Sequence, residues 1–345
     1  MAIFDGVFDW LLDEDNPPVR YLTLKNLLRK PAKAREVSRA KSRLMDYSVT
    51  EAILQHATKF WEDDDRAYWK YTGKYWQLIF LGQFLANGKD PRIAKGVNDI
   101  IDERKWVQTS GGHCLTANIL AAFARLGYGN HKVVKQEWEA LAARVIADDG
   151  IKCAAMDYSL LSRCYMAQPK LLLSFAQIPL KRRSSTVASA IKVLVENLLE
   201  HEVYVCVPGN LREWQEIIER HPKRAALPKG KTVKGWIGDR REEFLDAKGI
   251  GGRRPKQGWL RFGFPLHYNS DILEAMYALA VLDVPMSPRL KKPLKVIREK
   301  MTPNGKWIMQ NSLNGKMLAD VEEKGEPSKW LTYFACFVLN HFERA

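Results

Sequence analysis

The feature that most constrains this chain is a unit that recurs along it: an apolar helix, a turn of Gly or Pro, and a polar amphipathic helix. Helices that are apolar on most sides, covered by helices that are apolar on one face, would explain the alternation. A two-helix period near 40 residues predicts an all-α chain, either an open solenoid or a closed α/α barrel. The predicted apolar helices are 76–85, 115–123, one starting near 164, 271–282 and 330–342, and the predicted return helices are 92–103, 132–146, 184–200 and 289–300.

The residues between the helices support these boundaries. Asp90-Pro91 and Ser287-Pro288 each place an N-cap residue before a proline at the first helical position, where the missing N–H is not needed. Gly88 and Gly127, 39 residues apart, follow apolar helices at positions where a left-handed residue commonly ends a helix. We therefore expect both glycines to adopt left-handed backbone geometry.

Loops after two return helices carry a related pattern. Asn304-Gly305-Lys306-Trp307 follows the fourth return helix and Asp149-Gly150 follows the second, with Met301 and Lys152 at the pattern's glutamine and aromatic positions. Together with the helix pairs, these loops resemble the Gln-x-x-Asp/Asn-Gly-x-Trp repeats of the squalene–hopene cyclase and protein prenyltransferase superfamily. Segments 259–265, 268–271 and 327–330 look like those of its small single-domain prokaryotic members. The resemblance implies an all-α, α/α toroid of the terpenoid cyclase and prenyltransferase type.

The expected organisation is one domain over residues 1–345. Residues 1–60 should form helices that pack outside the ring. Residues 220–261 carry 13 Lys or Arg but only four Asp or Glu, and seven glycines are scattered through them. We interpret this segment as a basic insertion or long loop between the third and fourth units, because loops of this length are usually functional or disordered.

The resemblance also implies an activity. Triterpene cyclases start catalysis when the middle aspartic acid of an Asp-x-Asp-Asp motif protonates an alkene, and 268–271 aligns with that motif. Ser270 stands at the proton-donating position, and a hydroxyl cannot protonate an isolated alkene. Asp271 is therefore the candidate acid, with Tyr268 and Ser270 orienting it. The alternative is that Asp271 simply caps its helix.

Large rings gather near the predicted starts of the apolar helices. In the superfamily, such rings line the cavity and stabilise carbocations through their faces. The alternative is that they fill the barrel as packing. The candidate substrate-binding residues are Trp69, Tyr75, Trp76, Phe262, Phe264, His267, Trp307 and Trp330.

Three cysteines fall at the edges of predicted inner helices. Cys114, Cys153 and Cys164 could converge and bind zinc with His113 or His267, since Zn²⁺ prefers thiolate and imidazole ligands. Their spacing is irregular, so the alternative is that they are buried free thiols. No other cofactor is predicted. Five cysteines without short spacing favour a reducing compartment.

The net charge of +14 points to an anionic partner: a polyanion, an anionic lipid surface or a phosphorylated ligand. The predicted function is binding of an isoprenoid or similar lipophilic molecule in a central cavity, with acid-initiated cyclisation as its chemistry. The alternative is a non-enzymatic basic helical module that binds nucleic acid or an anionic membrane through Arg220–Arg261. Neither a signal peptide nor a transmembrane segment is predicted, so we expect a cytoplasmic protein, peripheral at the membrane if it takes up a lipid.

Overall fold

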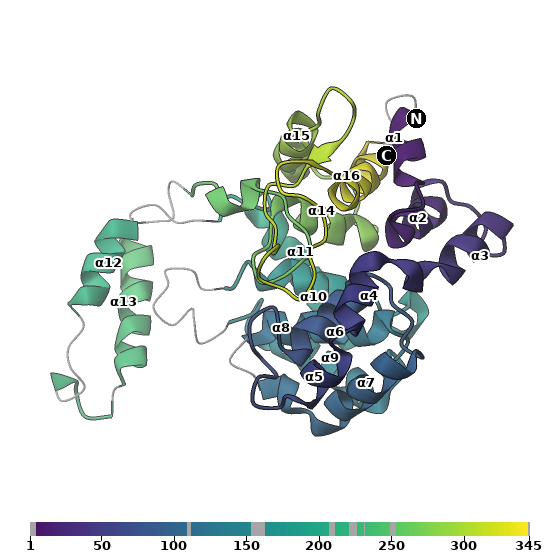
Figure 1. The fold of residues 1–345 in the computed structure, drawn as a ribbon. Helices are drawn as coiled ribbons and strands as arrows, with labels where there is room; N and C mark the ends of the chain where they lie inside the picture. The colour runs from purple at the N-terminus through teal and green to yellow at the C-terminus, as the bar shows by residue number, and fades with distance from the viewer. Residues whose placement is uncertain are drawn as a thin grey trace.

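The computed structural model describes residues 5–108, 112–152, 163–206, 211–220, 226–230, 232–248 and 253–343. Helices dominate these residues, which confirms the all-α prediction (Figure 1). The strands among them are β1 (Trp307–Ile308) and β2 (Pro327–Ser328), an antiparallel pair that joins Trp307 to Ser328. Short 3₁₀ turns also occur at Leu44–Asp46 (η3), Lys105–Gln108 (η4), Leu180–Arg182 (η6), Gln257–Leu260 (η8) and Pro288–Leu290 (η9).

The five predicted apolar helices are present, and each packs against the next one along the chain. Every residue of the first and third is buried, because these segments are apolar on nearly every side. Ring contacts also join the first and last of the five: the centroids of Phe84 and Trp330 lie 6.1 Å apart. The helices are α6 (Lys74–Gln83), α8 (Gly112–Arg125), α10 (Ala167–Phe175), α14 (Ile272–Val281) and α16 (Lys329–Phe342).

The four return helices are confirmed as well. Each buries one apolar face, as Ile93, Val97 and Ile100 do in the first of them. The predicted caps form, with Asp90 accepting from the Arg92 N–H and Ser287 from the Arg289 N–H. The helices are α7 (Pro91–Glu103), α9 (Lys132–Ala147), α11 (Ser185–Glu200) and α15 (Lys291–Glu299).

The two turn glycines differ in their roles. Gly127 has a φ of +98° and is left-handed as predicted. At the preceding turn the left-handed residue is Leu85, with a φ of +58°, so the expectation for Gly88 is wrong. Gly88 is needed for space instead, because a Cβ there would lie 2.0 Å from the carbonyl oxygen of Leu126.

The N-terminal helices cover the end of the chain. Of these, α1, α2 and the π-helical η2 all contact α16, and the Asn26 side chain donates a 2.7 Å hydrogen bond to the Tyr333 hydroxyl. Both ends of the chain therefore meet on one side of the molecule (Figure 1). The helices are α1 (Asp5–Leu11), α2 (Pro17–Leu22), η2 (Thr23–Leu27), α3 (Arg35–Ser42), α4 (Ser48–Leu54) and α5 (Ala57–Glu62).

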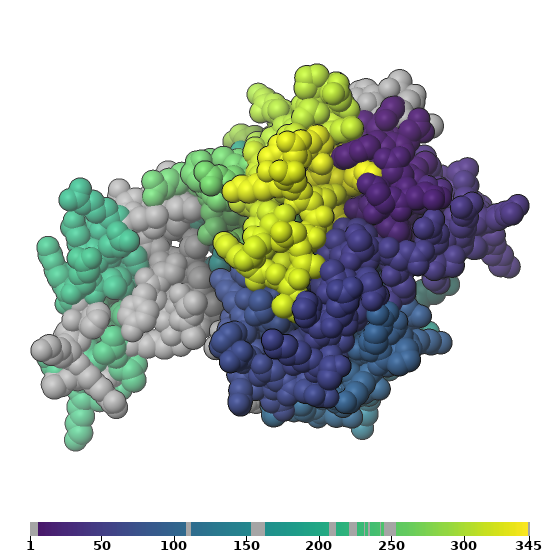
Figure 2. All heavy atoms as spheres, viewed as in Figure 1, coloured from purple at the N-terminus to yellow at the C-terminus, as the bar shows by residue number. Residues whose placement is uncertain are grey.

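The segment predicted as a basic insertion or long loop contains a helix. α12 (Leu211–Glu219) and α13 (Val233–Lys248) form a hairpin that stands beside the main body (Figures 1 and 2). Trp214, Ile237 and Phe244 give this hairpin an apolar core of its own. Its helices are not basic: α12 has one Arg and three Glu, and α13 has four cations and four carboxylates. The positive excess lies in the segments that flank and connect them.

Among the described helices, none has both the length and the apolar character needed to cross a bilayer.

Close backbone contact between α6 and α8 generates a first prediction. A Cβ at Gly82 would lie 2.7 Å from the Cα of Ala122, so Gly82→Ala must push the two helices apart. We expect this substitution to lower the free energy of unfolding by about 1–3 kcal/mol, as overpacking typically does. Gly238→Ala is the matched control, because open space surrounds that position on α13. Chemical denaturation of both variants is the measurement, and equal stabilities would contradict the close packing.

Candidate functional site

The segment that enters α14 carries the predicted acid. Asp271 is the N-cap of α14, and its Oδ1 accepts from the Glu274 N–H at 2.8 Å. Its Oδ2 accepts from the Gly263 N–H at 3.0 Å, which ties the loop before α14 to the helix start. Both carboxyl oxygens therefore have backbone donors, and the capping interpretation of Asp271 is confirmed.

Burial changes the acidity of this cap. Removal from water raises the pKa of Asp271 to about 7, although the two N–H donors and Lys170 act in the opposite direction. The nearby Glu274 carboxylate adds to the rise. Asp271 can therefore hold or release a proton close to neutral pH, which an ordinary surface aspartate cannot do.

A buried ion pair lies next to this cap. Lys170 of α10 and Glu274 of α14 are 0% and 1% exposed, and the Lys170 ammonium lies 2.6 Å from each Glu274 carboxylate oxygen. The third bond of the ammonium, 2.9 Å long, goes to the Ser270 hydroxyl. That hydroxyl in turn donates to the Met166 carbonyl oxygen at 2.8 Å. The side chains of Lys170 and Glu274 join α10 to α14, and Ser270 extends the network to the backbone of Met166.

These bonds decide what Ser270 can do. All three protons of the Lys170 ammonium are used, so Lys170 has no lone pair with which to take a proton from Ser270. The Ser270 proton is directed at a carbonyl oxygen rather than at a base. The arrangement is a positioning network and not an activated nucleophile.

The expected orienting contacts to Asp271 do not form. Ser270 bonds to Lys170 and Met166, as described above, and the Tyr268 hydroxyl shares a 2.5 Å hydrogen bond with the Tyr68 hydroxyl. Backbone N–H groups orient Asp271 instead. The prediction that Tyr268 and Ser270 orient the acid is corrected on this point, because both hydroxyls are committed to other partners.

His267 lies in the same loop. Its Nδ1 accepts from the Asn269 N–H at 3.3 Å and lies 3.5 Å from the Tyr71 hydroxyl. Burial, with help from nearby lysines that include Lys170 and Lys70, lowers the pKa of His267 to about 3. The ring is therefore neutral at physiological pH, and Nε2 carries its proton.

The other predicted substrate-binding rings are mostly packed in the core. Phe264 stacks on Trp330 with centroids 4.2 Å apart, and Trp76 meets Tyr268 edge-on at 5.0 Å. Trp69 is the exception, since it is 54% exposed under the Arg66 guanidinium. These contacts are those of rings that fill an interior. The remaining members of the set, Tyr75, Phe262 and Trp307, are each 2% exposed or less.

The zinc prediction depends on a residue that the structure does not describe, since Cys153 lies outside the described ranges. Cys164 is buried and Cys114 is partly exposed. Within the described part of the chain, no three His, Cys, Asp or Glu side chains gather as metal ligands would.

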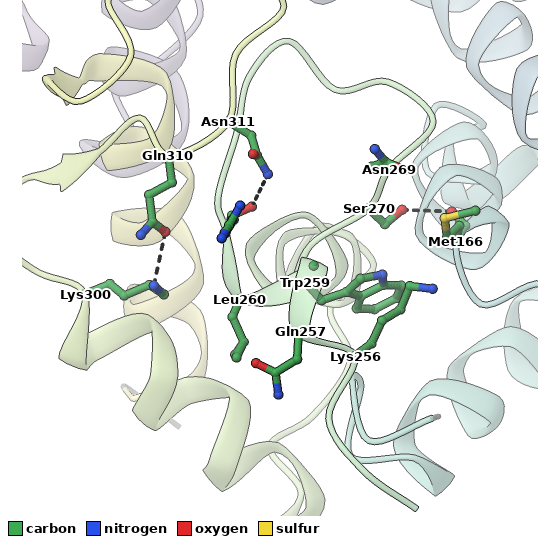
Figure 3. Close-up of a pocket in the computed structure, with 12 residues that line it drawn as sticks. Met166, Lys256, Gln257, Trp259, Leu260, Asn269, Ser270, Lys300, Gln310 and Asn311 are labelled. Atoms are coloured by element: carbon green, nitrogen blue, oxygen red, sulfur yellow. Dashed lines mark hydrogen bonds between the residues drawn. The ribbon is translucent and has the colours of Figure 1, made fainter. Parts of the chain in front are cut away.

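A pocket of about 640 Å³ opens beside Ser270 (Figure 3). Lys300 and Gln310 lie on one side of it, Asn269, Ser270 and Met166 on the other, and Trp259 and Lys256 between them. We call it the basic pocket. Its described lining is Met166, Lys256, Gln257, Gly258, Trp259, Leu260, Arg261, Asn269, Ser270, Lys300, Gln310 and Asn311.

The charge of the basic pocket has one sign. Its described lining includes Lys256, Arg261 and Lys300 and no Asp or Glu. None of the three forms an ion pair with a described carboxylate, although the Lys300 ammonium donates to the Gln310 side-chain oxygen at 3.1 Å. Burial lowers the pKa of Lys300, and the neighbouring Asp271 partly offsets this. The pocket thus offers cationic and amide donors to an anion.

None of the predicted substrate-binding rings lines the basic pocket. The pocket residues gather from the η8 turn, the end of α15 and the loop after β1, which lie far apart in the sequence. Lys170 and Glu274 were also not predicted. A signal was present, because each is a charged residue within an otherwise apolar helix, where burial requires a partner.

Comparison with models of known protein families, with curated proteins and with solved structures finds no match to this chain.

The buried ion pair generates a second prediction. Lys170→Met leaves the Glu274 carboxylate buried without its counter-ion, so we expect a loss of about 3–5 kcal/mol in the free energy of unfolding. The double variant Lys170→Met, Glu274→Met should recover most of that loss, because no uncompensated charge remains.

The matched control is Lys292→Met, which removes an exposed partner of Glu202 and should cost less than about 1 kcal/mol. Urea unfolding of wild type, Lys170→Met, Glu274→Met, the double variant and Lys292→Met is the measurement. A double variant that is as unstable as the two single losses added together would show that the charges are not coupled.

The acidity of Asp271 generates a third prediction. The pKa is about 7 in the folded state and about 3.9 in an unfolded chain, so the folded state binds the proton more tightly. Asp271 therefore makes the free energy of unfolding fall as pH rises from about 4 to about 7, with no further effect outside that window. In Asp271→Asn this contribution is absent.

The measurement is the difference in unfolding free energy between wild type and Asp271→Asn across pH 4 to 8. As pH rises, the free energy of unfolding of wild type should fall by up to about 4 kcal/mol relative to that of Asp271→Asn. The asparagine loses one backbone bond, but that cost does not depend on pH. Parallel pH profiles would rule out a raised pKa at Asp271.

Proposed function

We propose that this chain is a single-domain α/α toroid of the terpenoid cyclase and prenyltransferase type. The order of contacts supports this, because α6, α8, α10, α14 and α16 pack in sequence and the return helices α7, α9 and α11 pack in sequence beside them. The contact between Phe84 and Trp330 brings the first and last members together, as closure of a ring requires. The agreement of the helix pairs with the repeats of the superfamily is the second support.

The proposed function is the binding of a small anionic molecule in the basic pocket, with an isoprenoid or similar lipophilic part. The observation that carries it is the set of three cations, Lys256, Arg261 and Lys300, around one pocket whose described lining has no carboxylate. Like charges that face one pocket repel one another unless an anion joins them. A phosphate or carboxylate group would satisfy them, with Asn269, Gln310 and Asn311 as further donors. The lipophilic part of the ligand is proposed only from the resemblance of the chain to the cyclase and prenyltransferase superfamily.

An acid step at Asp271 is the second candidate function. The raised pKa favours it, because an acid that protonates an alkene must hold its proton near neutral pH. The proton would pass from the carboxyl to an alkene carbon, and the alkene π electrons would form the new C–H bond and leave a carbocation. Gly263 and Glu274 N–H groups would stabilise the carboxylate left behind. The cations of the basic pocket disfavour a carbocation close by, and for this reason the step ranks second. The pH profile of Asp271→Asn tests its premise.

The alternative of a nucleic-acid or membrane surface has less support. The hairpin that stands out from the body pairs some of its cations internally, as Arg212 does with Glu216 and Arg240 with Glu243. A zinc site likewise stays a proposal that requires Cys153 to approach Cys114 and Cys164.

Anion binding generates a fourth prediction. Isothermal titration with farnesyl diphosphate should give saturable binding, with farnesol as the neutral comparison that binds far more weakly. The double variant Lys300→Met, Arg261→Met should raise the dissociation constant tenfold or more, because charge-assisted hydrogen bonds are worth about 1.5–3 kcal/mol each.

The matched control is Arg289→Met, an exposed arginine of η9 outside the basic pocket, which should bind like wild type. Inorganic diphosphate should compete, since the head group carries the recognition. Equal affinity of farnesol and farnesyl diphosphate, or an unchanged affinity in the double variant, would overturn the proposed function.

A further inference from the structure

A larger cavity lies at the opposite end of the inner helices. Its volume is about 1140 Å³, and it runs between η2 and α3 on one side and the carboxyl-terminal ends of α8, α10 and α14 on the other. We call it the helix-end groove. Ser270 and Met166 of the basic pocket precede the amino-terminal ends of α14 and α10, so about 15 Å of helix separates the two cavities.

Four cations line the helix-end groove: Lys25, Lys41, Lys89 and Arg125. No Asp or Glu is among its described lining residues, and none of the four cations pairs with a described carboxylate. Lys25, Lys41 and Lys89 are exposed, whereas Arg125 is partly buried. Buried lysines elsewhere, Lys74, Lys170 and Lys329, each have carboxylate partners. Among the groove cations, Arg125 is therefore the one that is withdrawn from solvent without such a partner among the described residues.

Arg125 is the innermost of these cations. It belongs to the last turn of α8, and burial lowers the pKa of its guanidinium. A guanidinium stays charged at any physiological pH, so this side chain is a partly desolvated cation. The negative end of the helix dipole accounts for a cation at this position. The helix dipole does not supply hydrogen-bond partners, and the Arg125 guanidinium forms no hydrogen bond with the described residues. Its donors are available to a ligand in the groove.

The rest of the lining is largely apolar. Leu173 and Ala176 come from the end of α10, Val281 from the end of α14, and Phe337 from α16. The Tyr277 ring lies between these residues and packs on Phe337 with centroids 5.3 Å apart. The helix-end groove thus combines an apolar surface with an unpaired guanidinium and a rim of exposed lysines.

We propose that the helix-end groove binds a single-chain amphiphilic anion. Its carboxylate or phosphate head would pair with Arg125 and the lysines of the rim, and its alkyl chain would lie on Leu173, Ala176, Val281 and Phe337. Two oxygens of a carboxylate or a phosphate can accept the two parallel N–H bonds of a guanidinium, whereas an alcohol head group has only one oxygen. This site shares no lining residue with the basic pocket, so it stands independently of the proposed function.

The experiment is isothermal titration of the full chain with dodecanoate and dodecyl phosphate below their micellar concentrations, and with dodecanol below its solubility limit. We expect both anions to bind and dodecanol to bind at least tenfold more weakly. The anion that binds with the higher affinity identifies the preferred head group, carboxylate or phosphate. Arg125→Met should raise the dissociation constant of both anions tenfold or more, because one charge-assisted pair is lost.

Two further variants distinguish recognition of the head group from recognition of the alkyl chain. Lys132→Met, an exposed lysine of α9 outside both cavities, is the matched control and should bind like wild type. Ala176→Trp should fill the apolar part of the groove and weaken both anions without removing a charge. Equal binding of dodecanol and dodecanoate, an unaffected Arg125→Met protein, or no binding of either anion at millimolar concentration would overturn the proposal.

Binding of farnesyl diphosphate at the basic pocket should be unchanged in Arg125→Met. Loss of dodecanoate binding together with retention of farnesyl diphosphate binding would show two separate sites. If Lys300→Met, Arg261→Met abolished both, the anions would share the basic pocket and the helix-end groove would not be a site.

Discussion

The ion pair between Lys170 and Glu274 is the interaction on which the site depends. It joins α10 to α14, the two inner helices between which the chain departs to form the hairpin of α12 and α13. Each of the other pairs of sequential apolar helices has one return helix between its members, namely α7, α9 or α15. Here a long excursion separates the partners, so their contact must be specified by side chains. A buried ion pair specifies this contact because a buried charge without its partner is strongly destabilising.

The same pair organises the start of α14. Its third hydrogen bond holds Ser270, and the next residue, Asp271, caps the helix and fixes the loop at Gly263. Ser270 is also part of the wall of the basic pocket. The pocket, the buried acid and the contact between α10 and α14 are therefore parts of one hydrogen-bonded assembly. A change that separates α10 from α14 should alter all three.

The sequence predicted the helices well because their signals are local. Apolar runs, N-caps before proline and the 40-residue spacing placed nine helices close to their observed bounds. The left-handed turn at Leu85 was missed because the need for Gly88 comes from a carbonyl on a neighbouring turn, which no local pattern reveals. The helix α13 was missed because its described apolar residues, such as Ile237 and Phe244, form a separate small core with α12.

The candidate site could be predicted only in part. Asp271 was identified as a candidate acid from the alignment of 268–271 with the motif of the superfamily, and its capping role follows from its place before an apolar helix. The bonds of Ser270 and Tyr268 could not be predicted, because their partners Lys170 and Tyr68 are about 100 and 200 residues away. The aromatic residues were correctly placed near the helix starts, but composition alone does not separate rings that line a cavity from rings that fill a core.

The central claim is that Lys170 is a charged, fully hydrogen-bonded ammonium at the junction of α10 and α14. NMR of protein labelled with ¹⁵N at the lysine side chains measures this directly, with Lys170→Met used to assign the signal. The account predicts an ammonium resonance whose protons exchange slowly with water at neutral pH, because all three are held by Glu274 and Ser270. A Lys170 signal that exchanges as fast as those of exposed lysines, or that has the shift of a neutral amine, would contradict it.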